Sequence, residues 1–235
     1  MKTEKISGRR LKNKLLEVFK KEDLEKGLEE ILKLPARQAV NPLFYFFYNS
    51  DELIKWRSVT AMGAVVADLA MQDMESARVV MRRLIWNLND ESGGIGWGSP
   101  EAMGEIMACH PGLADEYSCI LISYVMRNGN FIELEALQRG VIWGMGRLAH
   151  ARPSLVVGAT PHILPFMESN DATIRGFTAW AAGALNPILT KPILAKLSDD
   201  KKKIHIFLNR QLVECTIGKL ARDALTKIKQ QHHSS

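Results

Sequence analysis

The chain has 235 residues, of which 46% are hydrophobic and 24% charged, a balance typical of a globular protein rather than a disordered one. Residues 1–21 hold eight Lys or Arg and two Asp or Glu, as do residues 201–235, whereas residues 22–200 hold 15 and 22. This acidic body argues against nonspecific nucleic-acid binding, which depends on Lys and Arg neutralising phosphates. No apolar run reaches the roughly 18 residues of a membrane span.

Cysteine and histidine usage gives no sign of a metal site. Cys109, Cys119 and Cys215 are an odd number without metal-ligand spacing, and the histidines are scattered. Residues 1–6 are basic but are not followed by the apolar segment of a signal peptide. We therefore expect reduced thiols in a cytoplasmic protein, no cofactor, no metal and no membrane association.

Apolar residues at helical spacing predict a succession of helices along most of the chain. Ser50 is a suitable N-cap for one of them, and Pro153, Pro161 and Pro165 break the segment around them into short pieces. The predicted helices cover residues 11–19, 24–32, 37–48, 51–69, 73–88, 99–108, 113–126, 133–149 and 171–185, and a last one follows Thr216.

One segment near the C-terminus has a different pattern. The β-prone runs 204–207 and 212–215 flank the polar residues 208–211. Short β-prone runs on either side of a polar turn are typical of a small hairpin.

An internal repeat organises the middle of the chain. Residues 54–63 and 95–104 share six identities at one offset of 41 residues, including Trp56 with Trp97 and Gly63 with Gly104. Weaker copies, Leu137–Gly146 and Ile174–Gly183, also end in small residues, which allow a neighbouring helix to pack closely. A recurring two-helix unit of about 40 residues predicts a helical solenoid.

The copy at residues 171–185 resembles the second helix of a HEAT repeat, with an aspartate, a β-branched residue, an arginine and a closing Gly-Ala-Leu. The chain also resembles bacterial HEAT-like proteins of unknown function that carry the Gly-Ile-Gly-Trp-Gly segment of residues 94–98. The resemblance implies an all-α fold, an α-α superhelix, with the small hairpin near its C-terminus. We expect one domain over residues 1–235: capping helices in 1–34, repeats in 35–190, and the hairpin and a capping helix in 191–235.

Stacked repeats place equivalent residues in columns, and two columns carry candidate binding residues. Trp97 with Glu101, and Arg139 with Trp143, are four residues apart, the spacing that places two side chains on one face of a helix. Trp180 continues the second column. Because Trp and Arg are enriched in binding hot spots, this face is a candidate groove for a protein or peptide partner. The alternative is that the tryptophans form core between repeats.

The glycine-rich stretch at residues 89–107 supports three interpretations. It is a phosphate cradle, a ligand loop formed by Glu91, Gly94, Gly96 and Trp97, or a tight turn that needs glycine for close backbone approach. No Gly-Lys-Ser/Thr follows the glycines, and the acidic residues at 90 and 91 would repel a phosphate.

One enzymatic alternative rests on a second resemblance. Residues 103–113 resemble a segment of the HEAT-like alkylpurine DNA glycosylases, but Gly96 stands where their catalytic aspartate is expected. The sequence assigns no catalytic residue and no oligomeric state. A non-catalytic scaffold remains the first hypothesis, for which we expect an acidic concave face, whereas a basic one would favour the glycosylase.

Overall fold

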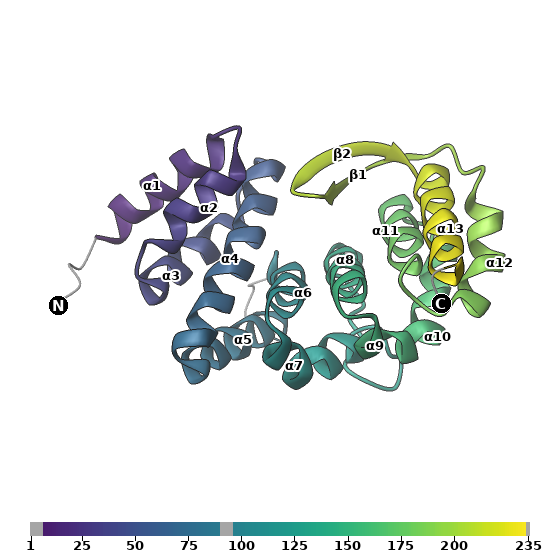
Figure 1. Cartoon of the computed structure of the whole chain (residues 1–235), viewed down its shortest axis with the longest axis horizontal. Coiled ribbons are helices and arrows are strands. Elements are labelled where there is room, and N and C mark those ends of the chain that lie inside the picture. Colours follow the sequence, from purple (N-terminus) through teal and green to yellow (C-terminus); the bar gives the residue numbers. More distant parts are fainter. Residues whose placement is uncertain (1–6, 90–95, 234–235) are drawn as a thin grey trace.

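The computed structural model describes residues 7–89 and 96–233, and most of them form paired helices that stack into a curved rod (Figure 1). This confirms the predicted all-α HEAT-like solenoid. Its buried hydrophobic side chains form a continuous core. The helices that face the inside of the curve are α4 (Glu52–Gln72), α6 (Ser99–Cys109), α8 (Glu135–Ala151), α11 (Ala172–Ala182) and α13 (Ile217–His233).

The outside of the curve carries the partner elements of these helices (Figure 1). They are α5 (Met74–Asn89), α7 (Pro111–Ser123), α9 (Pro153–Val156), η1 (Val157–Ala159), α10 (Thr160–Ile163), η2 (Leu164–Glu168) and α12 (Pro187–Leu197). The N-terminal end consists of α1 (Gly8–Lys20), α2 (Leu24–Leu32) and α3 (Ala36–Phe46). None of the described helices is both long and apolar enough to cross a membrane.

The repeated small residues lie where consecutive inner helices approach each other. A Cβ added to Gly63 of α4 would lie 2.5 Å from the Cγ atom of Glu105 on α6. One added to Gly104 of α6 would lie 2.4 Å from the Cα atom of Gly144 on α8, and one added to Gly146 would lie 2.5 Å from the Trp180 ring on α11. These distances confirm that small residues permit the close stacking of the repeats.

The predicted hairpin is present and crosses the concave side. β1 (Lys203–Leu208) pairs antiparallel with β2 (Gln211–Thr216). The two-residue turn has positive φ angles, 48° at Asn209 and 63° at Arg210, which match the right-handed twist of the strands. The hairpin extends from the C-terminal helices to the N-terminal ones (Figure 1), where Arg210 forms an ion pair with Glu25 of α2. The hairpin therefore connects the two ends of the curve.

Two details of the helix boundaries differ from the sequence prediction. The N-cap of α4 is Asp51 rather than Ser50, and its carboxylate accepts hydrogen bonds from the Leu53 and Ile54 amides. The helix α12 was not predicted, since the predicted helices end at residue 185 and resume only after Thr216. In the structure Asn186 caps α12 and Pro187 occupies its first turn, where a proline costs no hydrogen bond.

Candidate functional site

An aromatic cluster lies on the concave face. Trp56 of α4 and Trp143 of α8 have ring centroids 4.6 Å apart, and Trp143 and Trp180 of α11 are 6.0 Å apart. Phe207 of β1 stacks on Trp56 at 5.3 Å with nearly parallel rings. Tryptophans from three inner helices therefore meet on one surface, although the sequence placed Trp56 in a different column from Trp143 and Trp180.

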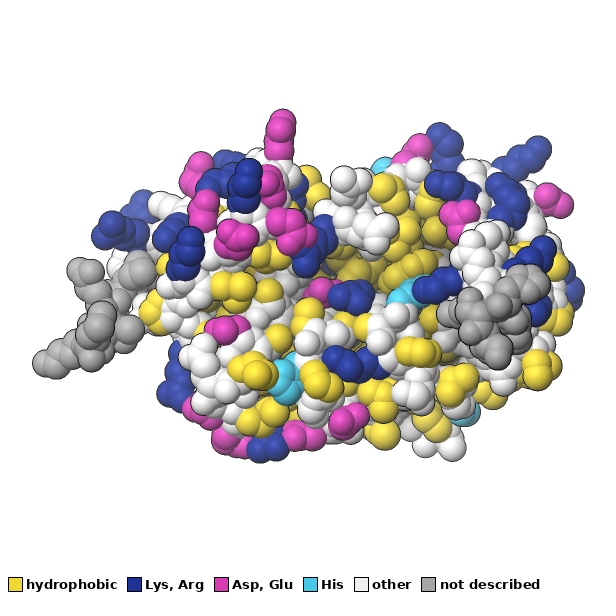
Figure 2. Space-filling view, in the orientation of Figure 1, with side chains coloured by type: hydrophobic (Ala, Val, Ile, Leu, Met, Phe, Trp, Pro, Cys, Tyr) yellow, Lys and Arg dark blue, Asp and Glu magenta, His cyan; other side chains and the backbone are white. Residues whose placement is uncertain are grey.

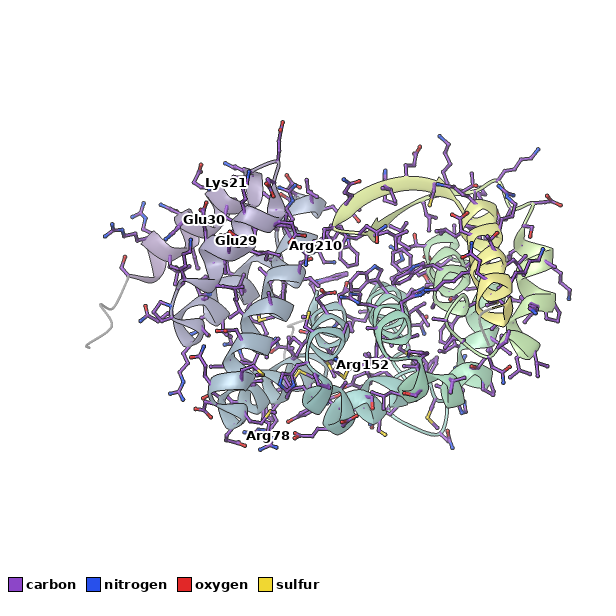
Figure 3. All side chains as sticks on the ribbon, in the orientation of Figure 1. Lys21, Glu29, Glu30, Arg78, Arg152 and Arg210 are labelled. Carbon is purple, nitrogen blue, oxygen red and sulfur yellow. The ribbon has the colours of Figure 1, made fainter. Side chains whose placement is uncertain are left out.

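The hairpin covers part of this cluster. Trp56 is 4% exposed and Trp143 2% exposed, and the Trp143 indole nitrogen donates a hydrogen bond to the Phe207 carbonyl oxygen at 3.0 Å. Figure 3 shows Arg210, at the tip of the hairpin, beside the N-terminal helices. The sequence left open whether these tryptophans line a groove or form core. They are buried, and a strand of the same chain contributes to that burial.

Beside the hairpin turn the concave face remains open. A pocket of about 490 Å³ lies between the turn and the inner helices, with Trp143, Trp180 and Phe207 as its aromatic lining. We call it the hairpin pocket; its polar lining includes Arg147, His150 and Lys227. In Figure 2 this face has a hollow with a hydrophobic floor and Lys and Arg side chains at its edge. The volume suits a small ligand or a few side chains of a larger one.

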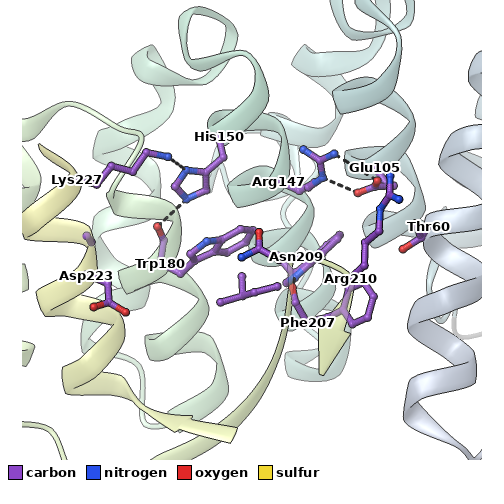
Figure 4. Close-up of a pocket in the computed structure, with 13 residues that line it drawn as sticks. Thr60, Glu105, Arg147, His150, Trp180, Phe207, Asn209, Arg210, Asp223 and Lys227 are labelled. Carbon is purple, nitrogen blue, oxygen red and sulfur yellow. Dashed lines mark hydrogen bonds and ion pairs between the residues drawn. The ribbon is translucent and has the colours of Figure 1, made fainter. Parts of the chain in front are cut away.

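The charged groups of the hairpin pocket are held in fixed positions (Figure 4). Arg147 of α8 donates to the buried Glu105 carboxylate of α6, with Nε 2.6 Å from Oε2. Lys227 of α13 lies 2.5 Å from Nδ1 of His150, whose Nε2 lies 3.1 Å from the Trp180 carbonyl oxygen. Burial, together with the charges of Lys227 and Arg147, lowers the pKa of His150 to about 4.

Two further charged residues, Asp223 and Arg210, lie at the edge of the hairpin pocket. Asp223 of α13 lines the hairpin pocket and is exposed, and Arg210 lies at the turn. Beyond the hairpin tip, a second cavity is bordered by Glu22, Asp23 and Glu25. The concave face is thus neither uniformly acidic nor uniformly basic.

Trp97 and Glu101 lie close together but outside the hairpin pocket. Trp97 lies in the turn before α6, so it does not share a helix face with Glu101. The sequence prediction that the two lie on one face of a helix is therefore wrong. They meet around Lys55 of α4, whose Nζ is 3.6 Å from Oε1 of the buried Glu101 and 5.7 Å from the centre of the Trp97 ring. Glu101 Oε2 has no hydrogen-bond partner within the described residues.

The glycine-rich stretch is described only from Gly96 onward. Gly96 has φ +64°, and an added Cβ would lie 2.6 Å from the Asn87 carbonyl oxygen. Gly98 has φ +74°, and an added Cβ would lie 2.7 Å from the Cγ atom of Phe47. At these two positions the interpretation as a tight turn fits. Glu91 and Gly94 lie outside the described residues, so the ligand-loop hypothesis stays a prediction.

Arg139, another candidate from the sequence, connects two repeats. It is exposed and pairs with Asp171, the N-cap residue of α11. The sequence analysis missed Arg147, His150 and Lys227. Arg147 and His150 follow Trp143 by four and seven residues, so helical spacing alone could have placed them on its face. Lys227 reaches the pocket only through the tertiary fold.

A relative from Archaeoglobus fulgidus matches most of the chain. An uncharacterised protein of Archaeoglobus fulgidus is 30% identical over 187 residues, which cover 76% of this chain and 91% of that protein. The chain belongs to the family of this archaeal protein. No model of a protein family matches the chain.

Solved structures similar to this family member are designed repeat proteins. One designed armadillo repeat protein has a TM-score of 0.50 at 14% identity, over 93% of this chain and 99% of its own. A second, solved in complex with the peptide (KR)4, has a TM-score of 0.51 at 15% identity, over 93% and 99%. These similarities show the fold, a solenoid of stacked helices.

Proposed function

We propose that the chain is a non-catalytic scaffold that binds a peptide segment of a partner protein in the hairpin pocket. The observation that carries the proposal is the partly buried Trp180, whose ring lines an open pocket of about 490 Å³ together with charged side chains. Aromatic side chains in such a setting supply large contact area, and fixed charges supply orientation. The solenoid fold is compatible with this role, since the designed armadillo protein of similar fold was solved with a peptide.

The polar groups of the hairpin pocket favour binding over catalysis. Both ring nitrogens of His150 are in hydrogen bonds, and the Glu105 carboxylate is held by Arg147. A general base needs a free lone pair within reach of the proton it removes. His150 has no free lone pair in this arrangement, and the Glu105 carboxylate is engaged in the ion pair with Arg147.

A duplex-binding role of the glycosylase kind has less support. Three cations line the hairpin pocket, but Arg147 pairs with Glu105 and Arg210 pairs with Glu25. Affinity for a phosphate backbone grows with the number of phosphates that free cations neutralise. Lys227 alone does not supply such a surface.

Selection from a displayed library of random dodecapeptides tests the proposal. Peptides enriched on the folded protein should lose at least about tenfold in affinity, measured by calorimetry, when Trp180 is replaced by Ala, because tenfold corresponds to about 1.4 kcal/mol of lost contact. Trp97→Ala is the matched control, since Trp97 lies outside the pocket. The proposal fails if no peptide is enriched, or if Trp180→Ala and Trp97→Ala have equal effects.

A further inference from the structure

Lys227 has an unusual position for a lysine. Its side chain is partly buried at the end of the hairpin pocket, on α13, and burial lowers its pKa. Among the side chains that the structure describes, no carboxylate lies within ion-pair distance of its ammonium group. Removing a charge from water without a counter-ion is unfavourable. A ligand that brings a negative charge to Lys227 would therefore be favoured at this site.

The neighbouring histidine orients Lys227. The Trp180 carbonyl oxygen can only accept, so Nε2 of His150 carries the proton and Nδ1 presents its lone pair to Lys227. His150 is therefore a neutral acceptor and does not neutralise the ammonium group. An ammonium group has three N–H donors, so two remain for a further acceptor.

Arg147 supplies a second positive group on the same wall. It lies one helical turn before His150 on α8 and pairs with Glu105, away from Lys227 (Figure 4). The Trp180 ring packs beside the His150 imidazole, with ring centroids 4.9 Å apart, and lines the same pocket (Figure 4). Arg147 is thus already neutralised by Glu105, whereas Lys227 lies beside an aromatic surface that can pack on the carbon chain of a ligand.

We infer that the hairpin pocket takes a glutamate or aspartate side chain of an acidic peptide segment, with Lys227 as its counter-ion and Trp180 as the packing surface. The inference rests on the proposed peptide binding. Glu105 does not compete for Lys227, because it is already paired with Arg147. Asp223 is exposed at the edge and opposes the ligand charge only weakly, since water screens it.

Labelled peptides with blocked ends test the charge preference. The probe is (Glu-Leu)4-amide with fluorescein attached to its N-terminal amine, and its controls are the (Gln-Leu)4 and (Lys-Leu)4 amides with the same N-terminal label. Fluorescence anisotropy should show the glutamate probe binding at least about tenfold more tightly than the glutamine probe, since hydrogen-bonded ion pairs exceed neutral ones by roughly 1.4 kcal/mol or more. Blocked ends remove the terminal charges, and the charge of the label is the same in all three probes.

Substitution of the lysine assigns the effect to the pocket. Lys227→Met should abolish the preference for glutamate, and Lys227→Arg should retain most of it. Lys219→Met is the matched control, because Lys219 is an exposed lysine of the same helix outside the pocket. Circular dichroism confirms that each variant is folded.

The possible results separate this inference from the proposed function. If the three probes bind equally and Trp180→Ala abolishes their binding, the inferred acidic preference is wrong, whereas the proposed peptide binding is supported. A glutamate preference that survives Lys227→Met also overturns the inference. Both proposals are overturned if a 20-base-pair DNA duplex binds more tightly than the glutamate probe and displaces it. Both are also overturned if no probe binds at about 1 mM, which is the weak end of measurable affinity.

Discussion

The indole nitrogen of Trp143 donates a hydrogen bond to the carbonyl oxygen of Phe207, joining an inner helix to the hairpin across 64 residues of sequence. Both residues are buried, so the carbonyl has no access to bulk water in place of this donor. An unpaired buried carbonyl costs roughly 1–3 kcal/mol. The bond therefore fixes the hairpin against the concave face.

Replacement of this donor should destabilise the protein. We expect Trp143→Phe to lower the free energy of unfolding by about 2 kcal/mol, through the unpaired carbonyl and the smaller ring. Urea unfolding followed by circular dichroism measures it. Trp180→Phe is the control, since no hydrogen bond of the Trp180 indole occurs within the described residues and its ring is only partly buried. Equal losses in the two variants would argue against a structural role for the bond.

The glycine contacts between inner helices should tolerate no side chain. Gly104→Ala places a methyl group 2.4 Å from both the Cα atom and the carbonyl oxygen of Gly144, and backbone cannot move aside cheaply. We expect a loss of at least about 2 kcal/mol, as for overpacked cores, seen as a lower melting temperature. Gly158→Ala, where nothing lies within 4 Å of the added Cβ, should change little. A similar melting temperature for both variants contradicts this account.

The fold could be predicted from local patterns in the sequence. Small residues such as Gly63 and Gly104 recur because consecutive inner helices approach each other closely in every repeat. The recurrence of small residues at one position therefore indicates a solenoid. The hairpin was visible for a similar reason, as two short β-prone runs around a polar turn. Neither pattern indicates that the hairpin crosses the concave side and reaches α2.

The site was less predictable, because identical residues in two repeats adopt different structures. α4 begins four residues before Trp56, whereas α6 begins two residues after Trp97. The left-handed conformations of Gly96 and Gly98 keep that segment out of the helix. The sequence match therefore placed Trp97 in the column of Trp56, although only Trp56 joins the aromatic cluster. Lys227 had no sequence signal, since its place depends on how α13 packs on α11.

Acidification should destabilise the folded protein through His150. Its pKa is about 4 in the folded chain against about 6.5 in the unfolded one, so the unfolded chain gains a proton first as pH falls through this window. Stability is thus complete above pH 6.5 and decreases towards pH 4. The charged groups facing the imidazole are Lys227 from α13 and Arg147 from its own helix.

The matched variant for this effect is His150→Gln. The glutamine amide can accept from Lys227 and donate to the Trp180 carbonyl but does not titrate. Between pH 7 and pH 5 the wild type should lose about 1–2 kcal/mol of unfolding free energy more than the variant, because one pKa unit is 1.36 kcal/mol. Urea titrations at the two pH values measure the difference. Parallel losses would show that other groups cause the acid sensitivity.

The hairpin turn carries an arginine at a position that favours glycine. Arg210 has φ 63°, a conformation that costs a residue with a Cβ about 1 kcal/mol, and its exposed ion pair with Glu25 returns at most about that amount. We therefore expect Arg210→Gly to be more stable than Arg210→Ala by about 1 kcal/mol in urea unfolding.

Backbone strain of this kind often occurs at functional sites, where the side chain contributes to binding. Since Arg210 lines the hairpin pocket, both variants should also bind the glutamate probe more weakly than the wild type. Equal stability of the two variants would remove the strain argument, and unchanged probe binding would leave Arg210 with only its contact to Glu25.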